Sequence, residues 1–244
     1  MTGRGAGDPP VLRYFDCRSR GQALRFALAG SGVEFVDERL PVADLRSFRA
    51  RAQEVDVGGP FASLPILAWG EHRVAQTLAI AGFLTEQLAE GEPPSDVGEH
   101  AFQAMIVSVA HLDMQVPYSP VLWLSEDVPD ETLREAGRRL LAHLRRKIEQ
   151  LERVLSERRG PLFGGAAPSL ADFFVYESLS RGRAVFGSAF GGHLDGSSGL
   201  RALEAAIEER PGIVDLLARR AVPFVVTGSP NERALRSRLR AFFG

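Results

Sequence analysis

The segment from Tyr14 to Arg25 places a phenol between an expected strand and an expected helix. Residues 11–15 form a short extended run, and apolar residues recur at helical spacing from Gln22 onward. A tyrosine at this junction can direct its hydroxyl toward the start of the helix, where unpaired N–H groups and the helix dipole favour an anion. A thiolate is such an anion. The alternative is a core aromatic side chain whose hydroxyl merely reaches the surface.

A second segment, residues 63–80, combines a proline in an apolar run with the start of another expected helix. Pro65 lies among apolar residues that are typical of an edge strand, where a trans proline is awkward. A cis bond between Leu64 and Pro65 would turn the backbone of Leu64 outward, free to pair with an extended peptide ligand. Gln76 and Thr77 then begin a helix whose first N–H groups could hold a carboxylate. A turn followed by an ordinary helix start would explain the same residues without a ligand.

A third segment, residues 168–172, has a structural role. Ser169 and Asp172 have the spacing of a capping box, in which each side chain pairs with the backbone N–H of the other residue. Pro168 and Phe173 could complete it as a hydrophobic staple. We therefore expect a helix to begin here and to be central to its domain.

The pattern of the chain changes near residue 90. Before it, strand and helix patterns alternate, with strands expected at 11–15, 34–40, 64–67 and 73–75 and helices after 22 and over 77–88. Residues 91–97 are rich in Pro, Gly and charge, as in a linker. After them, strand alternation is absent except for a short apolar run at 222–226. The sequence predicts a flexible tail (1–9), an α/β domain (10–90), a linker (91–97) and an all-α domain (98–244).

Two long helices are expected after the linker, over residues 99–124 and 131–158. In the second, with Asp130 as its expected N-cap, leucines and one isoleucine hold one face while arginines cover the others. An arginine-rich helix could indicate RNA binding. Four glutamates are interleaved with the arginines, however, so a solvated face is the preferred interpretation; they are Glu135, Glu149, Glu152 and Glu157.

The composition is that of a soluble globular protein of 244 residues, with 45% hydrophobic and 25% charged residues. A net charge of −2 gives no electrostatic reason to expect a nucleic-acid or membrane partner. Cys17 is the single cysteine, so no internal disulfide can form, and the five scattered histidines give no pair at metal-ligand spacing, so no metal is expected. No apolar run resembles a signal peptide or a membrane span. We expect a protein of the reducing cytoplasm.

Taken in this order and at these separations, the segments resemble the soluble glutathione transferase family. The resemblance extends from about Val11 to Leu239 and includes a strand tyrosine, an arginine motif, a Leu-Pro pair and a Gln-Thr pair followed by Ala-Ile. In this chain these are Tyr14, Arg18–Arg20, Leu64-Pro65, Gln76-Thr77 and Ala79-Ile80, with Arg210-Pro-Gly212 and Pro223-Phe-Val225 later. The Tyr-Phe start and the Gln-Thr pair are closest to the tyrosine-type classes, alpha and sigma among them. The resemblance implies a thioredoxin-like α/β N-terminal domain followed by an all-helical C-terminal domain.

Carried over to this chain, the resemblance implies a site with glutathione as co-substrate. Tyr14 would donate a hydrogen bond to the glutathione sulfur and hold it as a thiolate, while Arg20 adds positive field. The Leu64-Pro65 pair would bind the cysteinyl part through the leucine backbone. The Gln76-Thr77 pair would hold the γ-glutamyl carboxylate and amine.

Two further contacts follow from the same resemblance. Arg46, Arg49 and Arg51 all fit the contact with the glycine carboxylate of glutathione, and Arg51 is included in the predicted site. The family forms homodimers in which an acidic residue crosses the interface to the γ-glutamyl amine. Asp113 is the match in this chain, and an ordinary acidic residue on a helix surface is the alternative.

An apolar pocket for the second substrate is expected beside this site. Phe15, Met114 and Tyr118 are its predicted residues, with Phe242-Phe243 as a further contribution from the end of the chain. Aromatic residues in these positions are equally typical of an ordinary core.

The arginine motif leaves a rival mechanism open. Ser19 stands where the tyrosine-type classes usually carry glycine, and Cys17 lies two residues before it. Other classes of the family use a Ser or Cys near the start of the first helix, and a cysteine there favours thiol exchange through a mixed disulfide with glutathione. Counted back from Arg25, the rival position falls nearer Arg18 than Cys17. Cys17 as a passive loop residue is therefore the preferred interpretation.

The sequence predicts a glutathione transferase that conjugates the glutathione thiolate to small apolar electrophiles. The alternatives are a glutathione-dependent isomerase or a thiol reductase on the same fold, and a non-catalytic glutathione-binding module. Tyr14 together with Gln76-Thr77 argues against the non-catalytic module, because a decayed site has no physical reason to retain both. Detoxification is the expected role, in a homodimer.

Overall fold

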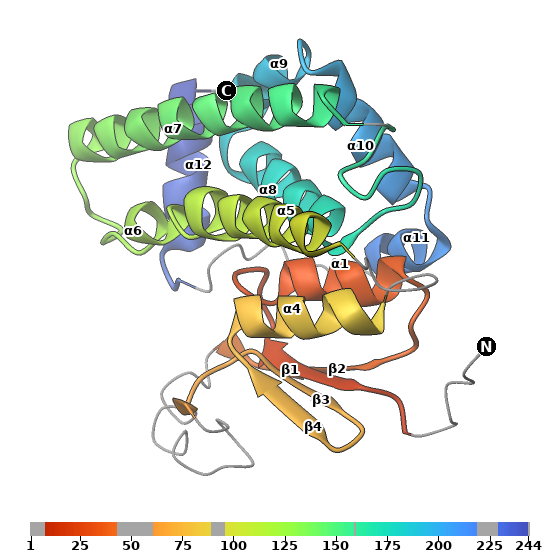
Figure 1. Cartoon of the computed structure of the whole chain (residues 1–244). Helices are drawn as coiled ribbons and strands as arrows, with labels where there is room; N and C mark the ends of the chain where they lie inside the picture. The colour runs from red at the N-terminus through yellow and green to blue at the C-terminus, as the bar shows by residue number, and fades with distance from the viewer. Residues whose placement is uncertain (1–7, 43–60, 89–95, 159, 219–228, 244) are drawn as a thin grey trace.

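The computed structural model describes residues 8–42, 61–88, 96–158, 160–218 and 229–243 of the chain. Within these ranges a four-stranded sheet lies at one end of the molecule, two helices cover one of its faces, and a helical domain packs on those helices (Figure 1). The apolar run at 222–226 lies outside the described residues.

The sheet belongs to the N-terminal domain. Its strands are β1 (Val11–Phe15), β2 (Val36–Leu40), β3 (Ile66–Trp69) and β4 (His72–Ala75), in the order β2-β1-β3-β4. β1 is parallel to β2 and antiparallel to β3, and β3 and β4 form a hairpin. A parallel pair needs a crossover connection, which α1 (Gln22–Gly30) supplies. The expected strands are present, with their ends shifted by a residue or two.

The two helices on the sheet are α1 and α4 (Thr77–Gln87), which lie between the sheet and the second domain (Figure 1). α1 is almost completely buried because both of its sides are covered in this way. It ends where the sequence predicts, at the turn that contains Gly32. Gly32 has a φ of 68°, in the left-handed region that glycine enters without steric cost.

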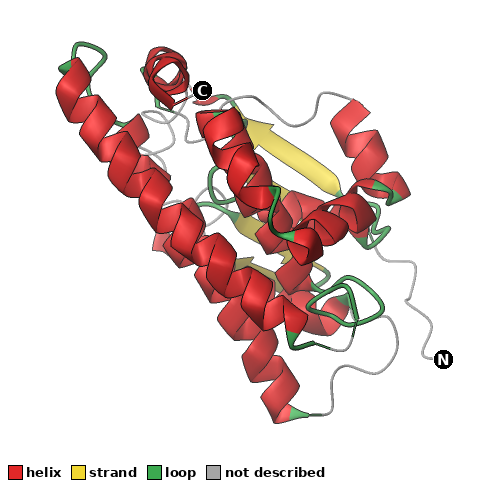
Figure 2. Ribbon diagram, turned by 90° about the horizontal axis from the view of Figure 1, so that it is seen from above, coloured by secondary structure: helices red, strands yellow, loops and turns green. Residues whose placement is uncertain are grey.

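The described part of the C-terminal domain is built from helices. They are α5 (Val97–Ser108), η3 (Val109–Gln115), α6 (Tyr118–Leu122), α7 (Asp130–Ser156), α8 (Leu170–Phe186), α9 (Ser188–Leu194), α10 (Ser198–Glu208), α11 (Pro211–Ala218) and α12 (Glu232–Phe243). The longest, α7, crosses the whole domain in the view from above (Figure 2). The predicted fold class, thioredoxin-like α/β followed by all-α, is confirmed. The exact domain boundaries stay a prediction.

The first long helix of this domain is interrupted, which the apolar pattern did not predict. In η3, a π-helical turn, the N–H of Val116 donates to the C=O of His111 at 3.0 Å. Pro117 explains the break, because proline has no N–H for the C=O of Asp113 and its ring crowds that carbonyl. The C=O of Asp113 pairs instead with Nε2 of His143 on α7, at 2.7 Å.

The start of α7 also differs from the prediction. Asp130 is the first helical residue and Pro129 precedes it as the cap, so Asp130 is not the N-cap. An aspartate is favoured by the helix dipole at either position, which leaves the sequence unable to choose. The carboxylate of Asp130 pairs with Nη2 of Arg238 on α12, at 2.6 Å. By contrast, the predicted capping box of Ser169 and Asp172 is present and begins α8.

The two domains share one apolar core, in which α1 packs against α8. Gly30, the last residue of α1, lies so close to Phe173 that a Cβ atom at residue 30 would come 2.2 Å from Cε1 of that ring. Nε of Arg210 donates to the C=O of Gly30. These contacts hold α1 firmly on the second domain. None of the described helices combines the length and the hydrophobicity needed to cross a lipid bilayer.

Candidate functional site

Tyr14 is the centre of the candidate site. It lies near the end of β1, 5% exposed, in a small apolar cluster with Cys17, Leu64 and Ile66. The N–H of Arg20 donates to its hydroxyl oxygen at 3.2 Å. Burial raises the pKa of Tyr14, so the phenol stays protonated near neutral pH. A phenol oxygen that accepts this N–H still carries its own proton. That proton can be donated to a further acceptor, such as an anion beside Tyr14.

The loop between β1 and α1 is held from within the N-terminal domain by Arg25. This side chain of α1 is completely buried. Its Nη1 donates to the C=O of Cys17 at 2.8 Å, and its Nη2 donates to the C=O of Phe15 at 3.0 Å. Its Nε pairs with Asp37 of β2 at 2.9 Å. Arg25 therefore fixes the backbone of the loop that follows Tyr14.

The structure also describes the segment that the sequence predicts to pair with a peptide ligand. The Leu64–Pro65 bond is cis, as the sequence predicted. Both residues are buried, and β3 begins at the next one. Gln76 is exposed directly before α4, and its amide donates to the hydroxyl of Ser63 at 3.1 Å. This hydrogen bond joins the two halves of the segment.

Thr77 links that segment to the loop beside Tyr14. Its side chain is buried, and its hydroxyl donates to the C=O of Arg20 at 3.4 Å. Arg20 is therefore bound on both sides through its backbone, by Tyr14 at the N–H and by Thr77 at the C=O. Because the hydroxyl of Thr77 is used in this way, the start of α4 offers a ligand mainly its unpaired backbone N–H groups.

The remaining loop residues differ in character. Cys17 is 2% exposed, and burial raises the pKa of its thiol to about 12. Such a thiol is protonated at neutral pH and is a poor nucleophile, which agrees with a passive loop residue. Ser19 has a φ of 26°, in the left-handed region that favours glycine. Arg20 extends its guanidinium to the surface, where it is exposed.

Sequence reasoning missed two residues of α8 that lie next to this loop. Glu177 and Arg181 are buried, and Glu177 pairs with Arg18 of the loop. A signal for them exists in the sequence. The run that forms α8 is apolar on nearly every side, which indicates a buried helix, and a glutamate inside a buried helix has to be paired.

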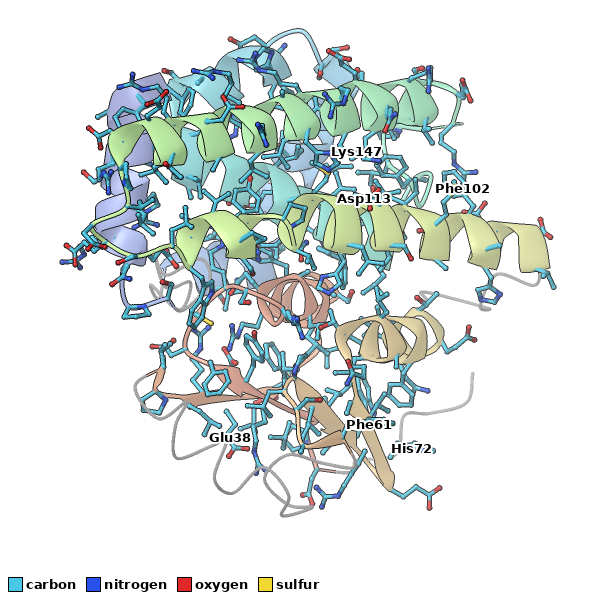
Figure 3. All side chains as sticks on the ribbon, turned by 90° about the vertical axis from the view of Figure 1, so that its left-hand side faces the viewer. Glu38, Phe61, His72, Phe102, Asp113 and Lys147 are labelled. Atoms are coloured by element: carbon cyan, nitrogen blue, oxygen red, sulfur yellow. The ribbon has the colours of Figure 1, made fainter. Side chains whose placement is uncertain are left out.

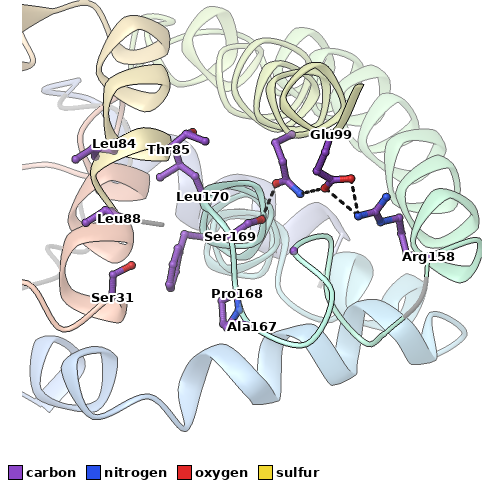
Figure 4. Close-up of a pocket in the computed structure, with 13 residues that line it drawn as sticks. Ser31, Leu84, Thr85, Leu88, Glu99, Arg158, Ala167, Pro168, Ser169 and Leu170 are labelled. Carbon is purple, nitrogen blue, oxygen red and sulfur yellow. Dashed lines mark hydrogen bonds and ion pairs between the residues drawn. The ribbon is translucent and has the colours of Figure 1, made fainter. Parts of the chain in front are cut away.

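A cavity lined by described residues lies away from this site. It has a volume of about 290 Å³ and lies between the far ends of α1 and α4 and the start of α8 (Figure 4). Its polar side chains largely pair with one another, Arg158 with Glu99 and Ser169 with Gln103. A second cavity, about 280 Å³, lies between α4 and α5. Neither of these two cavities is lined by Tyr14.

Comparison with known proteins relates this geometry to a family. Residues 112–220 match the family model of the glutathione S-transferase C-terminal domain. The glutathione S-transferase of Dermatophagoides pteronyssinus is 25% identical over 185 residues, which are 75% of this chain and 80% of that protein. Glutathione S-transferase alpha-5 of Rattus norvegicus is 33% identical over 116 residues, 46% of this chain and 49% of that protein. These matches support a glutathione transferase, with residues 112–220 assigned to the C-terminal domain of that family.

A solved structure shows the same fold. The Pi-class glutathione S-transferase of Onchocerca volvulus superposes with a TM-score of 0.70 and 20% identity, over 89% of this chain and 97% of that one. The family model covers part of the helical domain only, so the chemistry at Tyr14 depends on the geometry described above.

Two predicted pocket residues of the transferase lie in its core instead. Met114 and Tyr118 are completely buried, so they do not line an open pocket. The physical reason is that helical apolar spacing is the same for a core face and for a pocket face. Phe15 is half-buried and meets Tyr14 edge to face, with the ring centroids 5.8 Å apart. Phe242-Phe243 packs on the core at the end of α12.

The other predicted contacts are Asp113 and the three arginines proposed for the glycine carboxylate. Asp113 lies on η3, where its carboxylate pairs with Nζ of Lys147 on α7 at 2.8 Å (Figure 3). Its contact with a second subunit stays a prediction. Arg46, Arg49 and Arg51 lie outside the described residues. Within the described ranges, no three His, Cys, Asp or Glu side chains come together in a way that could hold a metal ion.

Proposed function

We propose that this transferase conjugates glutathione to small apolar electrophiles, with the glutathione sulfur held as a thiolate by Tyr14. The observation that carries the proposal is the buried Tyr14 hydroxyl, whose oxygen already accepts the N–H of Arg20 at 3.2 Å. Its proton is left to donate to a sulfur anion. α1 begins two residues after Arg20, so the positive end of its dipole adds to the preference for an anion.

The energy required is modest. Lowering the pKa of a thiol by about two units needs a preference of ~2.7 kcal/mol for the anion. A hydrogen bond to a charged group contributes about 1.5–3 kcal/mol, and a helix start contributes about 0.3–1 kcal/mol. The positive guanidinium of Arg20 adds to this preference for the anion. Because burial raises the pKa of Tyr14, the phenol does not ionise in place of the thiol.

Glutathione would lie between the Leu64-Pro65 pair and the start of α4. The backbone of Leu64 would pair with the cysteinyl part, and the N–H groups of Gln76-Thr77 would hold the γ-glutamyl carboxylate. Arg51 is the proposed partner of the glycine carboxylate. This arrangement corresponds to the tyrosine-type classes, alpha or sigma.

The electrophile would approach the sulfur from the side of Phe15. The ring of Phe15 is half-buried against Tyr14 and offers an apolar surface next to the reacting group. An apolar molecule gains from covering that surface, since burial of apolar area stabilises by about 25 cal/mol per Å². Detoxification in the cytoplasm is the proposed role of such a reaction.

A homodimer is part of the proposal, with Asp113 reaching the partner's glutathione. Exposed apolar side chains on α4, α5 and η3 support it, among them Leu78, Met105 and Leu112, with exposed fractions of 36%, 50% and 48%. Figure 3 views the molecule from the side that carries Phe61 and Asp113. Apolar surface of this kind is typical of a contact between subunits. Sedimentation at micromolar concentration should give twice the chain mass of 26.6 kDa, and a species of the chain mass alone would contradict the dimer.

Retention on immobilised glutathione, followed by a conjugation assay with a model electrophile, tests the proposed activity. Retention with conjugation supports it. Retention with isomerisation or disulfide reduction in place of conjugation favours the alternative enzymes, and retention without turnover favours a non-catalytic module. A protein that is not retained and does not conjugate contradicts the proposal.

A further inference from the structure

Three buried charged side chains join the loop beside Tyr14 to the helical domain. Arg18 belongs to the loop, Glu177 and Arg181 belong to α8, and the side chains are 7%, 0% and 2% exposed. Nε of Arg18 donates to Oε1 of Glu177 at 3.2 Å, and its Nη2 donates to Oε2. Nε and Nη2 of Arg181 donate to the same Oε1, at 3.1 and 2.7 Å. One carboxylate therefore holds two guanidinium groups.

Burying these three charges has a desolvation cost, so stability alone does not explain the arrangement. Charges are buried at a loss unless each is paired and hydrogen-bonded, and apolar side chains often fill such a space equally well. Further donors are satisfied here, since Nη2 of Arg18 donates to Ser180 at 3.0 Å and Nη1 of Arg181 donates to the C=O of Gln115 at 3.4 Å. A fully bonded network of this kind specifies one arrangement of the loop.

The loop group that Arg181 fixes is the one that contacts Tyr14. Nη2 of Arg181 donates to the C=O of Ser19. That C=O belongs to the same peptide group as the N–H of Arg20, which donates to the Tyr14 hydroxyl at 3.2 Å. A peptide group is planar and rigid, so a bond that fixes its C=O also fixes its N–H. Arg181 and Tyr14 are bound to opposite ends of one peptide group.

Two further properties make this link consequential. Ser19 has a φ of 26°, which a serine adopts only when the surroundings hold it there. The positive guanidinium of Arg181 beside the C=O also polarises the peptide group. Such polarisation strengthens the hydrogen bond that the N–H donates by about 10–30%. A stronger donor on the Tyr14 oxygen makes the phenol a better donor to the sulfur.

Other ionisable side chains surround the network. They are Cys17, Arg20 and Arg25 of the N-terminal domain, His111 of η3, Tyr118 of α6, Tyr176 of α8, and Glu232 and Arg236 of α12. Burial lowers the pKa of His111 and raises the pKa of Tyr118, so both side chains are neutral near pH 7. Two arginines and one glutamate give the network itself one net positive charge.

We propose that Arg181, oriented by Glu177, is a positioning residue for the ionisation of bound glutathione and acts on Tyr14 through the Ser19–Arg20 peptide group. This inference rests on the proposed function of Tyr14. It adds a residue of α8 to the groups of the N-terminal domain that stabilise the thiolate. Docking of the two domains then becomes a condition of catalysis.

A double-mutant cycle tests the link. The pH dependence of conjugation is measured for wild type, Arg181→Met, Tyr14→Phe and the double variant. In the Arg181→Met variant, the conjugation rate at pH 6.5 should be about tenfold lower and should recover toward pH 9. The KM for glutathione should change less than about threefold. In the Tyr14→Phe background the Arg181→Met substitution should have no further effect, because the peptide group then has no hydroxyl to act on.

Arg183→Met is the matched control, since Arg183 lies two residues further along α8 and pairs with Glu204. It should leave the pH profile unchanged. An equal effect of Arg181→Met in both backgrounds, no effect, or an equal effect of the control overturns the inference.

If Arg181→Met does not fold, the triple variant R18M/E177L/R181M replaces it, since no unpaired charge then remains buried. An unchanged pH profile in that variant overturns the inference. A wild-type protein without conjugation overturns the proposed function as well, whereas an active wild type with additive variants overturns this inference alone.

Discussion

Gly21 lies directly against the ring of Tyr14: a Cβ atom at residue 21 would come 2.5 Å from Cδ1 and 2.8 Å from Cγ of that ring. The backbone of Gly21, with φ −97° and ψ −23°, is one that any residue adopts. Conformational freedom is therefore not what this position requires. The missing side chain lets the start of α1 approach the ring of Tyr14.

We expect Gly21→Ala to displace the Tyr14 ring without unfolding the protein. Overpacking of this kind costs about 1–3 kcal/mol, while conjugation at pH 6.5 should fall tenfold or more because the hydroxyl leaves its place. Gly192→Ala is the control, because a Cβ atom at this position in α9 meets no atom within 4 Å. It should keep full activity with an equal or higher melting temperature. Full conjugation by Gly21→Ala would contradict the position assigned to Tyr14.

Tyr14→Phe should separate binding from chemistry. Glutathione affinity should stay within a few-fold, while conjugation at pH 6.5 to 7 falls by roughly ten- to a hundred-fold, because the hydroxyl bonds the sulfur more strongly as an anion than as a thiol. The bound thiol of the variant should have a higher pKa, so its rate should recover toward pH 9. A pH series of conjugation rates measures this. An unchanged rate at pH 6.5 would contradict the tyrosine mechanism.

The part of the site that the sequence predicted comes from local signals. Tyr14 follows from a strand that leads into a helix, and the cis bond at Pro65 follows from a proline inside an apolar run. The capping box of Ser169 and Asp172 is another pattern contained in a few residues. Each depends on neighbours in the chain, and each is present in the structure.

The rest depends on contacts between distant segments. The bond from Arg18 to Glu177 spans 159 residues. The apolar run that forms α8 indicates that Glu177 is buried and paired, but it does not indicate that Arg18 is the partner. Met114 has the helical spacing of both a pocket and a core, and only the packing of the domain places it in the core. The break near Pro117 is an exception, because a proline is a local signal, although one uninterrupted helix over residues 99–124 was predicted from the sequence.

Cys17 should contribute nothing to conjugation. Burial raises its pKa to about 12, so Cys17→Ala should leave the rate unchanged, and a thiol reagent at pH 7.5 should modify the native protein far more slowly than the unfolded one. The raised pKa also has a consequence at alkaline pH. The unfolded thiol ionises near pH 9 and the folded thiol only near 12, so this stabilisation is complete below pH 9 and is lost as the pH rises through 12.

Denaturation as a function of pH tests the second part. Wild type should lose more free energy of unfolding between pH 8 and pH 10.5 than Cys17→Ala, which lacks the titrating group. Equal slopes for the two proteins would contradict the buried thiol. Abolished conjugation in Cys17→Ala, together with normal conjugation in Tyr14→Phe, would instead support thiol exchange as the mechanism.

The carboxylate of Asp172 is expected to be the most costly single loss in the helical domain. It accepts the N–H groups of Phe163, Gly164 and Ser169 at 2.8, 3.0 and 2.8 Å, and the Ser169 hydroxyl at 2.8 Å. Asp172→Ala leaves the three N–H donors without their acceptor, at about 1–3 kcal/mol for each that stays buried, so we expect a loss above ~3 kcal/mol. Ser169→Ala removes one cap only and should cost about 1 kcal/mol.

Urea denaturation of the two variants measures these losses, with Asp130→Ala as the control. The Asp130 side chain is 66% exposed and pairs with Arg238 at the start of α7, so its removal should cost less than about 1 kcal/mol. Since the Asp172 carboxylate caps the start of α8 and α8 carries Arg181, a loosened α8 should also lower conjugation at pH 6.5, with recovery toward pH 9. An Asp172→Ala protein no less stable than Asp130→Ala would contradict the role given to the capping box, because the N–H groups it leaves unpaired would then have found another acceptor.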